Sequence, residues 1–222
     1  NLQSLDDIGN LEDDEVLVCD QTIVGMSLDP LEAALLTEET WEAQLENITS
    51  DRRVVESSGT LIRHPWDLVN QNGEQLIIDF QLRQFGPSQT PMGPHVALGP
   101  HASLGEQGAL GQQVAVLGSQ DQVYVDPTAK VEPFVVLGAR RGPVTIDAGA
   151  VIESFTRLEG PCHIGAEAHL LRANVREGTT IGPVCRVGGE IEETILHGYV
   201  NKCHDGFLGH SYVGTWVNLG AL

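Results

Sequence analysis

The chain is short of positive charge. Only 12 of its 222 residues are Lys or Arg, against 31 Asp or Glu, and the formal net charge is −19. Residues 1–80 hold 18 acidic and 3 basic side chains, whereas the remaining 142 residues carry a balance of only −4. Nucleic-acid binding relies on Lys and Arg against phosphates. The composition therefore excludes a nucleic-acid partner and indicates a solvated acidic surface.

Long apolar runs and cysteine pairs are also missing. No run of about 18 apolar residues occurs, so neither a membrane span nor a membrane partner is expected. The sequence begins Asn-Leu-Gln and shows no leader of basic and then apolar residues, so no secretory signal is expected. The cysteines show no CxxC pair, which favours free thiols in a cytoplasmic protein over disulfides or structural zinc. They are Cys19, Cys162, Cys185 and Cys203.

An aliphatic side chain instead recurs every six residues through the C-terminal half. Gly often follows it, as in Ile164-Gly165 and Ile181-Gly182. A period of six fits neither an α-helix nor a simple alternating strand, and it predicts a coiled β-solenoid with about 18 residues per coil. Glycine beside the aliphatic residue suits the backbone at the corners of such a coil. The predicted inward residues are Val125, Val131, Leu137, Ile146, Ile152, Leu158, Ile164, Leu170, Val175, Ile181, Val187, Ile195, Phe207, Val213 and Leu219.

The N-terminal part reads differently. Residues 1–85 predict a partial α/β domain, with a strand over Glu15–Cys19, a helix from Pro30 to about Asn47 capped by Asp29, and a second helix over Pro65–Phe85. The Asn72-Gly73 pair is a possible break in that second helix. Residues 86–122 read as a linker, which is either a degenerate first coil or a glycine-rich connection. The β-helix is expected over 123–222, with the last coil cut short at its C-terminal end.

A polar segment from His197 to Ala221 interrupts the aliphatic series. It holds three histidines, a lysine and an aspartate. Asn201 falls on the six-residue spacing between Ile195 and Phe207, where an unpaired amide would be costly. We therefore expect Asn201 either to lie in a loop that leaves the coil or to be held by backbone hydrogen bonds. This irregular point is where the sequence predicts chemistry.

The same segment carries a family resemblance. The string His204-x-x-Phe-x-Gly209, followed by Val213-Gly-x-x-Val-Asn-Leu-Gly-Ala221, resembles the acetyltransferase domain of bifunctional N-acetylglucosamine-1-phosphate uridylyltransferase/glucosamine-1-phosphate acetyltransferases. The sequence of residues 201–212, together with that of residues 181–190, is similar to a divergent bacterial branch of sugar-nucleotidyltransferase-like proteins. The resemblance covers roughly residues 123–222 and extends to 60–80, around His64-Pro-Trp-Asp-Leu-Val-Asn70.

This resemblance implies a mainly β fold, in which a left-handed parallel β-helix follows part of an α/β nucleotidyltransferase-like domain. It implies a homotrimer that acetylates a hexosamine 1-phosphate from acetyl-CoA. His204 takes the position of the general base, Asn218 that of a substrate or base-supporting residue, and the Ala221 N–H that of an oxyanion donor. Imidazole suits the role because it titrates near working pH. Lys202 and Arg186 are candidate ligands of a sugar or CoA phosphate.

The chain departs from the family pattern at several positions. Phe207 stands where Tyr is usual, and Glu190, Glu192 and Glu193 replace a basic cluster. The glycine-rich nucleotide signature and its Lys are absent, so Mg²⁺ is expected only at a nucleotidyltransferase site that this chain does not reveal. No metal ligands are assigned. The alternative function is a non-catalytic trimerisation or regulatory β-helix of a sugar nucleotidyltransferase, in which His204 only caps a loop.

Overall fold

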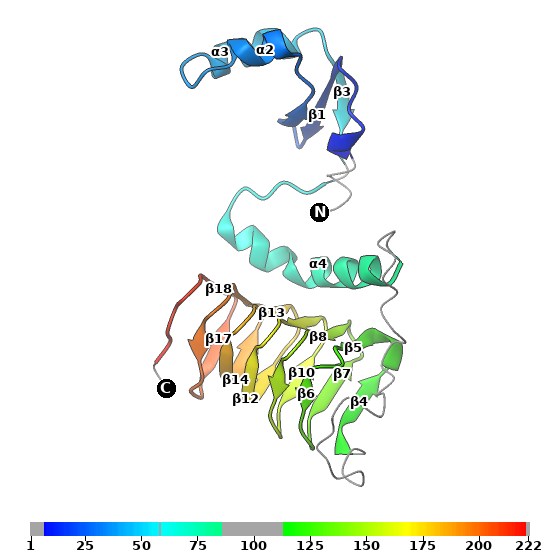
Figure 1. The fold of residues 1–222 in the computed structure, drawn as a ribbon, viewed down its shortest axis with the longest axis vertical. Helices are drawn as coiled ribbons and strands as arrows, with labels where there is room; N and C mark the ends of the chain where they lie inside the picture. The colour runs from blue at the N-terminus through cyan, green and yellow to red at the C-terminus, as the bar shows by residue number, and fades with distance from the viewer. Residues whose placement is uncertain (1–6, 58, 86–112, 221–222) are drawn as a thin grey trace. The chain divides into compact units, whose positions relative to one another are not determined.

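The computed structural model describes residues 7–57, 59–85 and 113–220. They form two compact units, residues 1–63 and residues 64–222. The first is a small α/β unit, and the second joins one long helix to a β-solenoid of about six turns (Figure 1). Within the described ranges, no helix combines the length and apolar character needed to cross a bilayer.

The first unit is built on a three-stranded sheet in the order β2-β1-β3. Strand β1 (Glu15–Cys19) pairs antiparallel with β2 (Thr22–Met26) and parallel with β3 (Arg53–Glu56). The predicted strand is therefore confirmed, with the expected bounds. Val16 and Leu17 of β1 are buried and form the centre of this unit.

The predicted helix after Asp29 is confirmed at its start and wrong at its length. Asp29 accepts from the backbone N–H groups of Leu31 and Glu32, and the Glu32 side chain bonds back to the Asp29 N–H. This reciprocal capping fixes the start of α2 (Pro30–Leu35). The helix then stops, because the Thr40 hydroxyl donates to the Leu35 carbonyl at 2.8 Å and replaces a helical bond there. A separate helix, α3 (Trp41–Thr49), follows.

Helix α4 (Pro65–Phe85) has the predicted bounds and continues unbroken through Asn72 and Gly73. It packs within the second unit, against the solenoid strands β11 (Cys162–Ile164), β13 (Thr179–Ile181) and β18 (Tyr212–Val213). A Cβ at Gly73 would lie 3.6 Å from the Gly178 Cα, so glycine here lets the helix backbone approach the coil closely. Val69 and Phe80 of this helix are buried, whereas Trp66 and Leu68 are exposed.

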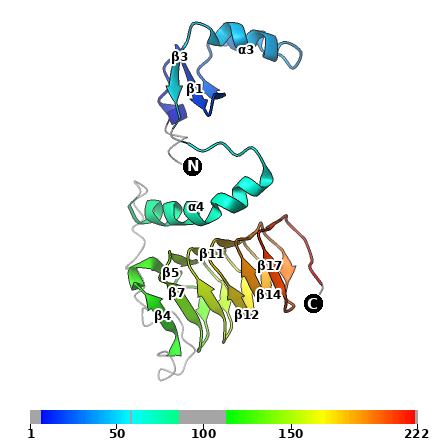
Figure 2. The same cartoon turned by 180° about the vertical axis from the view of Figure 1, so that it is seen from behind.

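The solenoid has three faces made of parallel strands (Figure 2). The helix face, along which α4 lies, consists of β5 (Val123–Val125), β8 (Val144–Ile146), β11 (Cys162–Ile164), β13 (Thr179–Ile181), β15 (Ile195–Leu196) and β18 (Tyr212–Val213). The second face consists of β6 (Lys130–Val131), β9 (Val151–Ile152), the first parts of β12 (His169–Val175) and β14 (Arg186–Glu192), and β16 (Asn201–Lys202). The third consists of β4 (Ala115–Gly118), β7 (Val136–Ala139), β10 (Arg157–Glu159), the later parts of β12 and β14, and β17 (Phe207–Gly209).

Strand β4 shows that the solenoid begins before the predicted residue 123. It pairs in parallel with β7, with Val116 opposite Leu137. Val116 is the last of four apolar residues that are spaced by six over residues 98–116. It thus belongs to a coil, while the other three of this set lie outside the described residues. A short 3₁₀ turn at Gln120–Gln122 then leads into β5.

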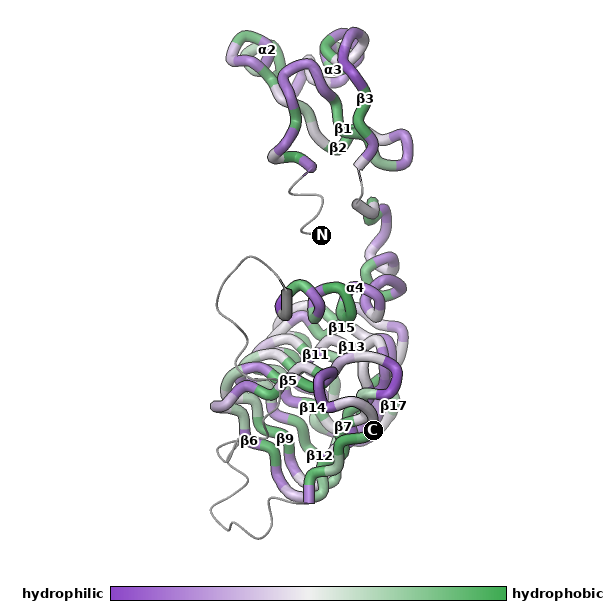
Figure 3. The backbone as a smooth tube through the Cα atoms, turned by 90° about the vertical axis from the view of Figure 1, so that its right-hand side faces the viewer, coloured by the Kyte–Doolittle hydropathy of each residue, from purple (hydrophilic) through white to green (hydrophobic). Residues whose placement is uncertain are grey.

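The inward aliphatic residues form a continuous core. Figure 3 shows hydrophobic positions, in green, recurring along successive coils. Leu137, Ile152, Leu158, Ile164, Leu170, Ile181 and Val187 are all essentially inaccessible to solvent, as the spacing predicts. The predicted β-solenoid is therefore confirmed. Partner strands repeat after 21 residues in the early coils, as for Lys130 and Val151, and after 15 from Arg186 to Asn201.

The inward series shifts by one residue after Val187, and here the sequence prediction was wrong. Ile191 and Leu196 point inward, whereas Ile195 is only half-buried. The next inward residues are Lys202 and Leu208, so Asn201 faces outward and Phe207 is 61% exposed. The cause is a short corner: β14 runs through Gly189, whose φ of +74° turns the chain within a single strand.

Substitution of Leu196 and Phe207 tests this shift. Leu196→Ala should lower the free energy of unfolding by about 2–5 kcal/mol, because it leaves a cavity in the prism. Phe207→Ala should cost about 1 kcal/mol or less, since its ring is largely in water. Chemical denaturation of the two variants measures both values. An equal cost at the two positions would contradict the observed phase.

Candidate functional site

Three polar side chains lie in register on the second face near the C-terminal end of the solenoid. Arg186 pairs with Asn201 across β14 and β16, and Asn201 forms a bridge with Asn218 on the following coil. The Asn201 Nδ2 donates to the Asn218 Oδ1 at 2.8 Å. Successive parallel strands place these residues in one column, so two of the predicted residues, Arg186 and Asn218, are brought to the same surface.

Asn201 is the residue of this column that the sequence analysis misassigned. Its side chain is outward, and its Oδ1 is buried without a hydrogen-bond partner among the described residues. A buried amide oxygen of this kind is costly to leave unpaired. The oxygen is inaccessible from the surface, so it is an unpaired acceptor within the wall of the column and not a contact point for a ligand. The signal in the sequence was present, because Asn201 and Asn218 lie 17 residues apart, but the incorrect phase hid it.

His204 lies two residues beyond β16, in the bend that leads to β17. Its side chain is exposed, and its backbone carbonyl accepts a hydrogen bond from Lys202 at 2.9 Å. The imidazole is thus accessible to a ligand, while the main chain that carries it is held from inside the coil. Ala221, the predicted oxyanion donor, lies outside the described residues.

Lys202 occupies an inward position and is only 5% exposed. Its ammonium group donates to the carbonyls of Gly188 at 2.9 Å, His204 at 2.9 Å and Gly206 at 3.1 Å. Burial lowers the pKa of this ammonium below its ordinary value of 10.5. All three ammonium protons are taken by the backbone. The predicted contact of Lys202 with a phosphate is therefore inconsistent with this geometry.

Removal of this buried ammonium should destabilise the coil. Lys202→Met keeps the length of the side chain but leaves three carbonyls without their donor, so the free energy of unfolding should fall by roughly 2–4 kcal/mol. Lys130→Met is the matched control, because Lys130 is exposed on the same face, and it should change stability by less than about 0.5 kcal/mol. Urea titrations of both variants test this, and equal stability of Lys202→Met and the parent chain would refute the assignment.

The glutamates expected to oppose phosphate binding are regular parts of the third face. Glu190 and Glu192 lie in β14 and form ion pairs with Arg176 at 3.5 and 3.2 Å. Glu193, at the next corner, pairs with the His210 Nδ1 at 2.8 Å. Arg176 is shared with Glu177, so this one cation only partly offsets the negative charge of the third face, which is a different face from that of Arg186. Phe207, in β17, pairs in register with Glu190 on the same face.

Among the described residues, the cysteines and the other histidines form no further candidate centre. Cys162 and Cys185 are buried free thiols, and burial raises the pKa of both, which disfavours the thiolate form. His197 instead contacts the Thr215 hydroxyl through its Nδ1 at 3.2 Å. Across the ranges that the structure describes, no three His, Cys, Asp or Glu side chains gather at a position that would hold a metal ion.

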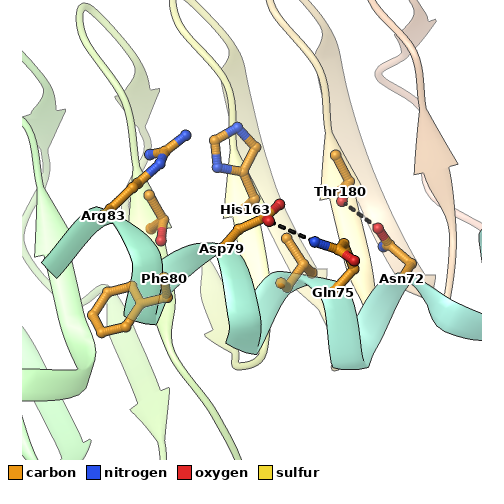
Figure 4. A pocket seen from close by; sticks show the side chains of 9 residues that line it. Asn72, Gln75, Asp79, Phe80, Arg83, His163 and Thr180 are labelled. Carbon is orange, nitrogen blue, oxygen red and sulfur yellow. Dashed lines mark hydrogen bonds between the residues drawn. The ribbon is translucent and has the colours of Figure 1, made fainter. Parts of the chain in front are cut away.

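A second polar region lies between α4 and the helix face (Figure 4). It is a cavity of about 240 Å³, to which α4 contributes Asp79 and Arg83 and the solenoid His163. Asn72 fastens one end, because it donates to the Gly178 carbonyl at 2.8 Å and accepts from the Thr180 hydroxyl at 3.0 Å. Sequence patterns missed this cavity, since its walls come from segments about a hundred residues apart.

Charged groups hold the other end of the same cavity. Asp147 contacts Arg83 at 3.3 Å and the His163 Nε2 at 3.4 Å. Burial under the helix lowers the pKa of His163 below its usual 6.5, although Asp147 and Asp79 oppose the shift and Arg83 adds to it. His163 is therefore neutral at physiological pH. Asp147, His163 and Arg83 thus form a polar contact between α4 and the solenoid, which we call the seam.

The depressed pKa of His163 predicts a pH-dependent stability. Below its ordinary pKa of 6.5 the unfolded chain binds a proton at this position before the folded chain does, so stability should fall as pH drops from about 6.5 toward the folded pKa. His163→Asn should flatten this slope in thermal unfolding between about pH 5.5 and 7.5. His197→Asn removes an exposed imidazole and should keep it. If His163→Asn retains the full slope, its titration is not the cause.

Comparison with known proteins adds two findings. Residues 1–86 match the family model described as sugar nucleotidyl transferase. The chain is also similar to proteins named Bifunctional protein GlmU. The relative from Jannaschia sp. (strain CCS1) is 36% identical over 101 residues, which are 44% of this chain and 21% of that protein. The relative from Anaplasma marginale (strain Florida) is 37% identical over 114 residues, which are 47% and 26% of the two chains.

The chain thus combines a sequence that matches the sugar nucleotidyl transferase model with a β-solenoid built on a hexapeptide repeat. The resemblance drawn from the sequence is confirmed as a similarity: residues 1–86 match that model, and the chain is similar to proteins named Bifunctional protein GlmU. The chain spans only 21–26% of the length of these two relatives.

Proposed function

We propose that the β-helix carries out acetyl transfer from acetyl-CoA to the amine of a hexosamine 1-phosphate, as part of nucleotide-sugar synthesis for the cell envelope. One observation supports this proposal: the exposed His204 lies two residues beyond β16, whose Asn201 is the middle residue of the Arg186–Asn201–Asn218 column. A basic group at the end of this strand, with an amide pair and a guanidinium in the column, suits a substrate with an amine, hydroxyls and a phosphate.

The chemistry assigns each residue a role. The sugar nitrogen attacks the thioester carbonyl, a C–N bond forms, and the C–S bond to CoA breaks. His204 takes the proton that the amine loses and returns it to the leaving thiolate. Asn218, held by the Asn201 amide, orients the sugar, and Arg186 binds its phosphate through the planar guanidinium fork.

The remaining components of the reaction are proposals of the same kind. The Ala221 N–H is the candidate oxyanion donor. A homotrimer is expected because copies of the β-helix can pack around a symmetry axis and form a closed assembly. Acetyl-CoA is the acyl donor. Mg²⁺ would serve only a nucleotidyltransferase site, to which no described residue is assigned. The protein would work in the cytoplasm on small-molecule substrates.

A second candidate, a non-catalytic trimerisation or regulatory β-helix, is favoured by one observation. The ammonium of Lys202 is occupied by backbone carbonyls, so one of the two cations expected at the phosphate is absent from the surface. Phe207, in place of a tyrosine, removes a hydroxyl from the same region. A module of this type should form the trimer and bind no acetyl-CoA.

Steady-state acetylation of glucosamine 1-phosphate by the complete gene product separates the two candidates. His204→Ala should lower kcat by about a hundredfold or more, with little change in KM, because only proton transfer is lost. Arg186→Gln should instead raise the KM for the sugar phosphate. The control is His197→Ala, a neighbouring exposed histidine, which should stay within about twofold of the parent.

Calorimetric titration of acetyl-CoA completes the test. Binding that survives in His204→Ala, while turnover disappears, supports an acetyltransferase with His204 as the base. The acetyltransferase proposal fails if the parent protein binds no acetyl-CoA, or if His204→Ala acetylates at the parent rate.

A further inference from the structure

Three arginines surround a cavity at the corner between the third face and the helix face. Arg140 and Arg141 follow β7, and Arg157 begins β10 on the next coil. Their side chains line a cavity of about 250 Å³ together with Leu117, Gly138, Glu159 and Gly160. Residues 123–222 contain six arginines, so half of them meet at this cavity.

The floor of this cavity is rigid. A Cβ at Gly160 would lie 2.2 Å from the Gly142 carbonyl oxygen, and one at Gly142 would lie 2.8 Å from the Pro161 ring. The two corners therefore stack so closely that neither glycine could carry a side chain. Tight stacking of this kind holds the backbone of Arg140 and Arg141 in place, so little order has to be created when a ligand binds.

The charges at this corner are not balanced. Arg141 is paired with Glu177, and Arg157 is paired with Glu159. Arg140 is exposed and makes no ion pair or side-chain hydrogen bond within the part of the chain that the structure describes. The five groups thus carry one excess positive charge in a protein of net charge −19. The arginines of these pairs are exposed and ion pairs near the surface are weak, so an anion can displace their carboxylates.

We propose that this arginine corner is a binding site for the phosphate or pyrophosphate group of a small metabolite. Guanidinium groups bind phosphate oxygens in bidentate fashion, and three of them can embrace a dianion. A water molecule occupies about 30 Å³, so the cavity has room for a pyrophosphate and a few waters. Because the protein as a whole repels anions, binding has to come from this local cluster rather than from the general surface.

This site is separate from the acetyl-transfer site proposed above. Arg140 and Arg157 lie at an early corner of the third face, whereas Arg186, Asn201 and Asn218 lie on the second face of later coils. Phosphate binding here does not require that His204 be catalytic. It provides a place where a phosphorylated compound can bind the β-helix without occupying the acceptor column.

Calorimetric titration of inorganic pyrophosphate into the full chain, at physiological salt, tests the site. The parent should bind, and Arg140→Gln should weaken the affinity by about tenfold or more, as expected for the loss of charged hydrogen bonds. Arg172→Gln is the matched control: it removes the same charge from another exposed corner and should stay within about twofold. Arg140→Lys, which keeps the charge but not the fork, should fall between the two.

Two results would overturn the proposal. One is a parent chain that binds neither inorganic phosphate nor pyrophosphate. The other is equal weakening by Arg140→Gln and Arg172→Gln, which would mean that the anion responds only to net charge. Thermal unfolding of each variant confirms that the β-helix is intact, so a loss of affinity is assigned to the site. Acetylation of glucosamine 1-phosphate by Arg140→Gln, measured in parallel, distinguishes failure of this site from failure of the acetyl-transfer proposal.

Discussion

Each short strand of the solenoid has to place one apolar side chain in a narrow interior, and the rest of the structure depends on this constraint. Leu137, Leu158 and Ile181 are completely buried, and strands of only two or three residues persist because neighbouring coils cover them on both sides. The outward positions are then free to vary. They supply the seam beneath α4, the column at Arg186 and the arginine corner.

The six-residue spacing was enough to predict the solenoid and most of its core, because every coil up to Val187 keeps an aliphatic residue at each inward position. It failed where a corner contracts. Ile191 follows Val187 at a spacing of four, because Gly189 turns the chain with a single left-handed residue, and Leu196 follows Ile191 at a spacing of five. The predicted series therefore selects Ile195, Asn201 and Phe207, each one residue too early, and agrees with the structure again at Val213. Backbone conformation at one glycine is a local fact that periodicity does not contain.

The candidate site could be predicted in part, and the missing part has the same origin. Family resemblance suggested His204 and Asn218, and the chemistry of the guanidinium suggested Arg186; register then places Arg186 and Asn218 in one column. The amide pair of Asn201 and Asn218 was hidden by the error in phase. The seam of Asp147, His163 and Arg83 was not accessible to sequence reasoning, since it exists only where a distant helix packs on a coil.

Lys202 has a structural role in place of the phosphate-binding role that the sequence suggested. A lysine beside a proposed catalytic histidine suggests phosphate binding, yet its stem fills an inward position and its ammonium binds three carbonyls, among them that of His204. An inward methylene chain satisfies the packing constraint, and a buried ammonium is tolerated only because it is fully hydrogen-bonded. The bend that carries the imidazole is thereby fastened to the core. The main chain at His204 is therefore held in place, although this segment has little regular structure. Arg186 remains as the surface cation of the proposed site.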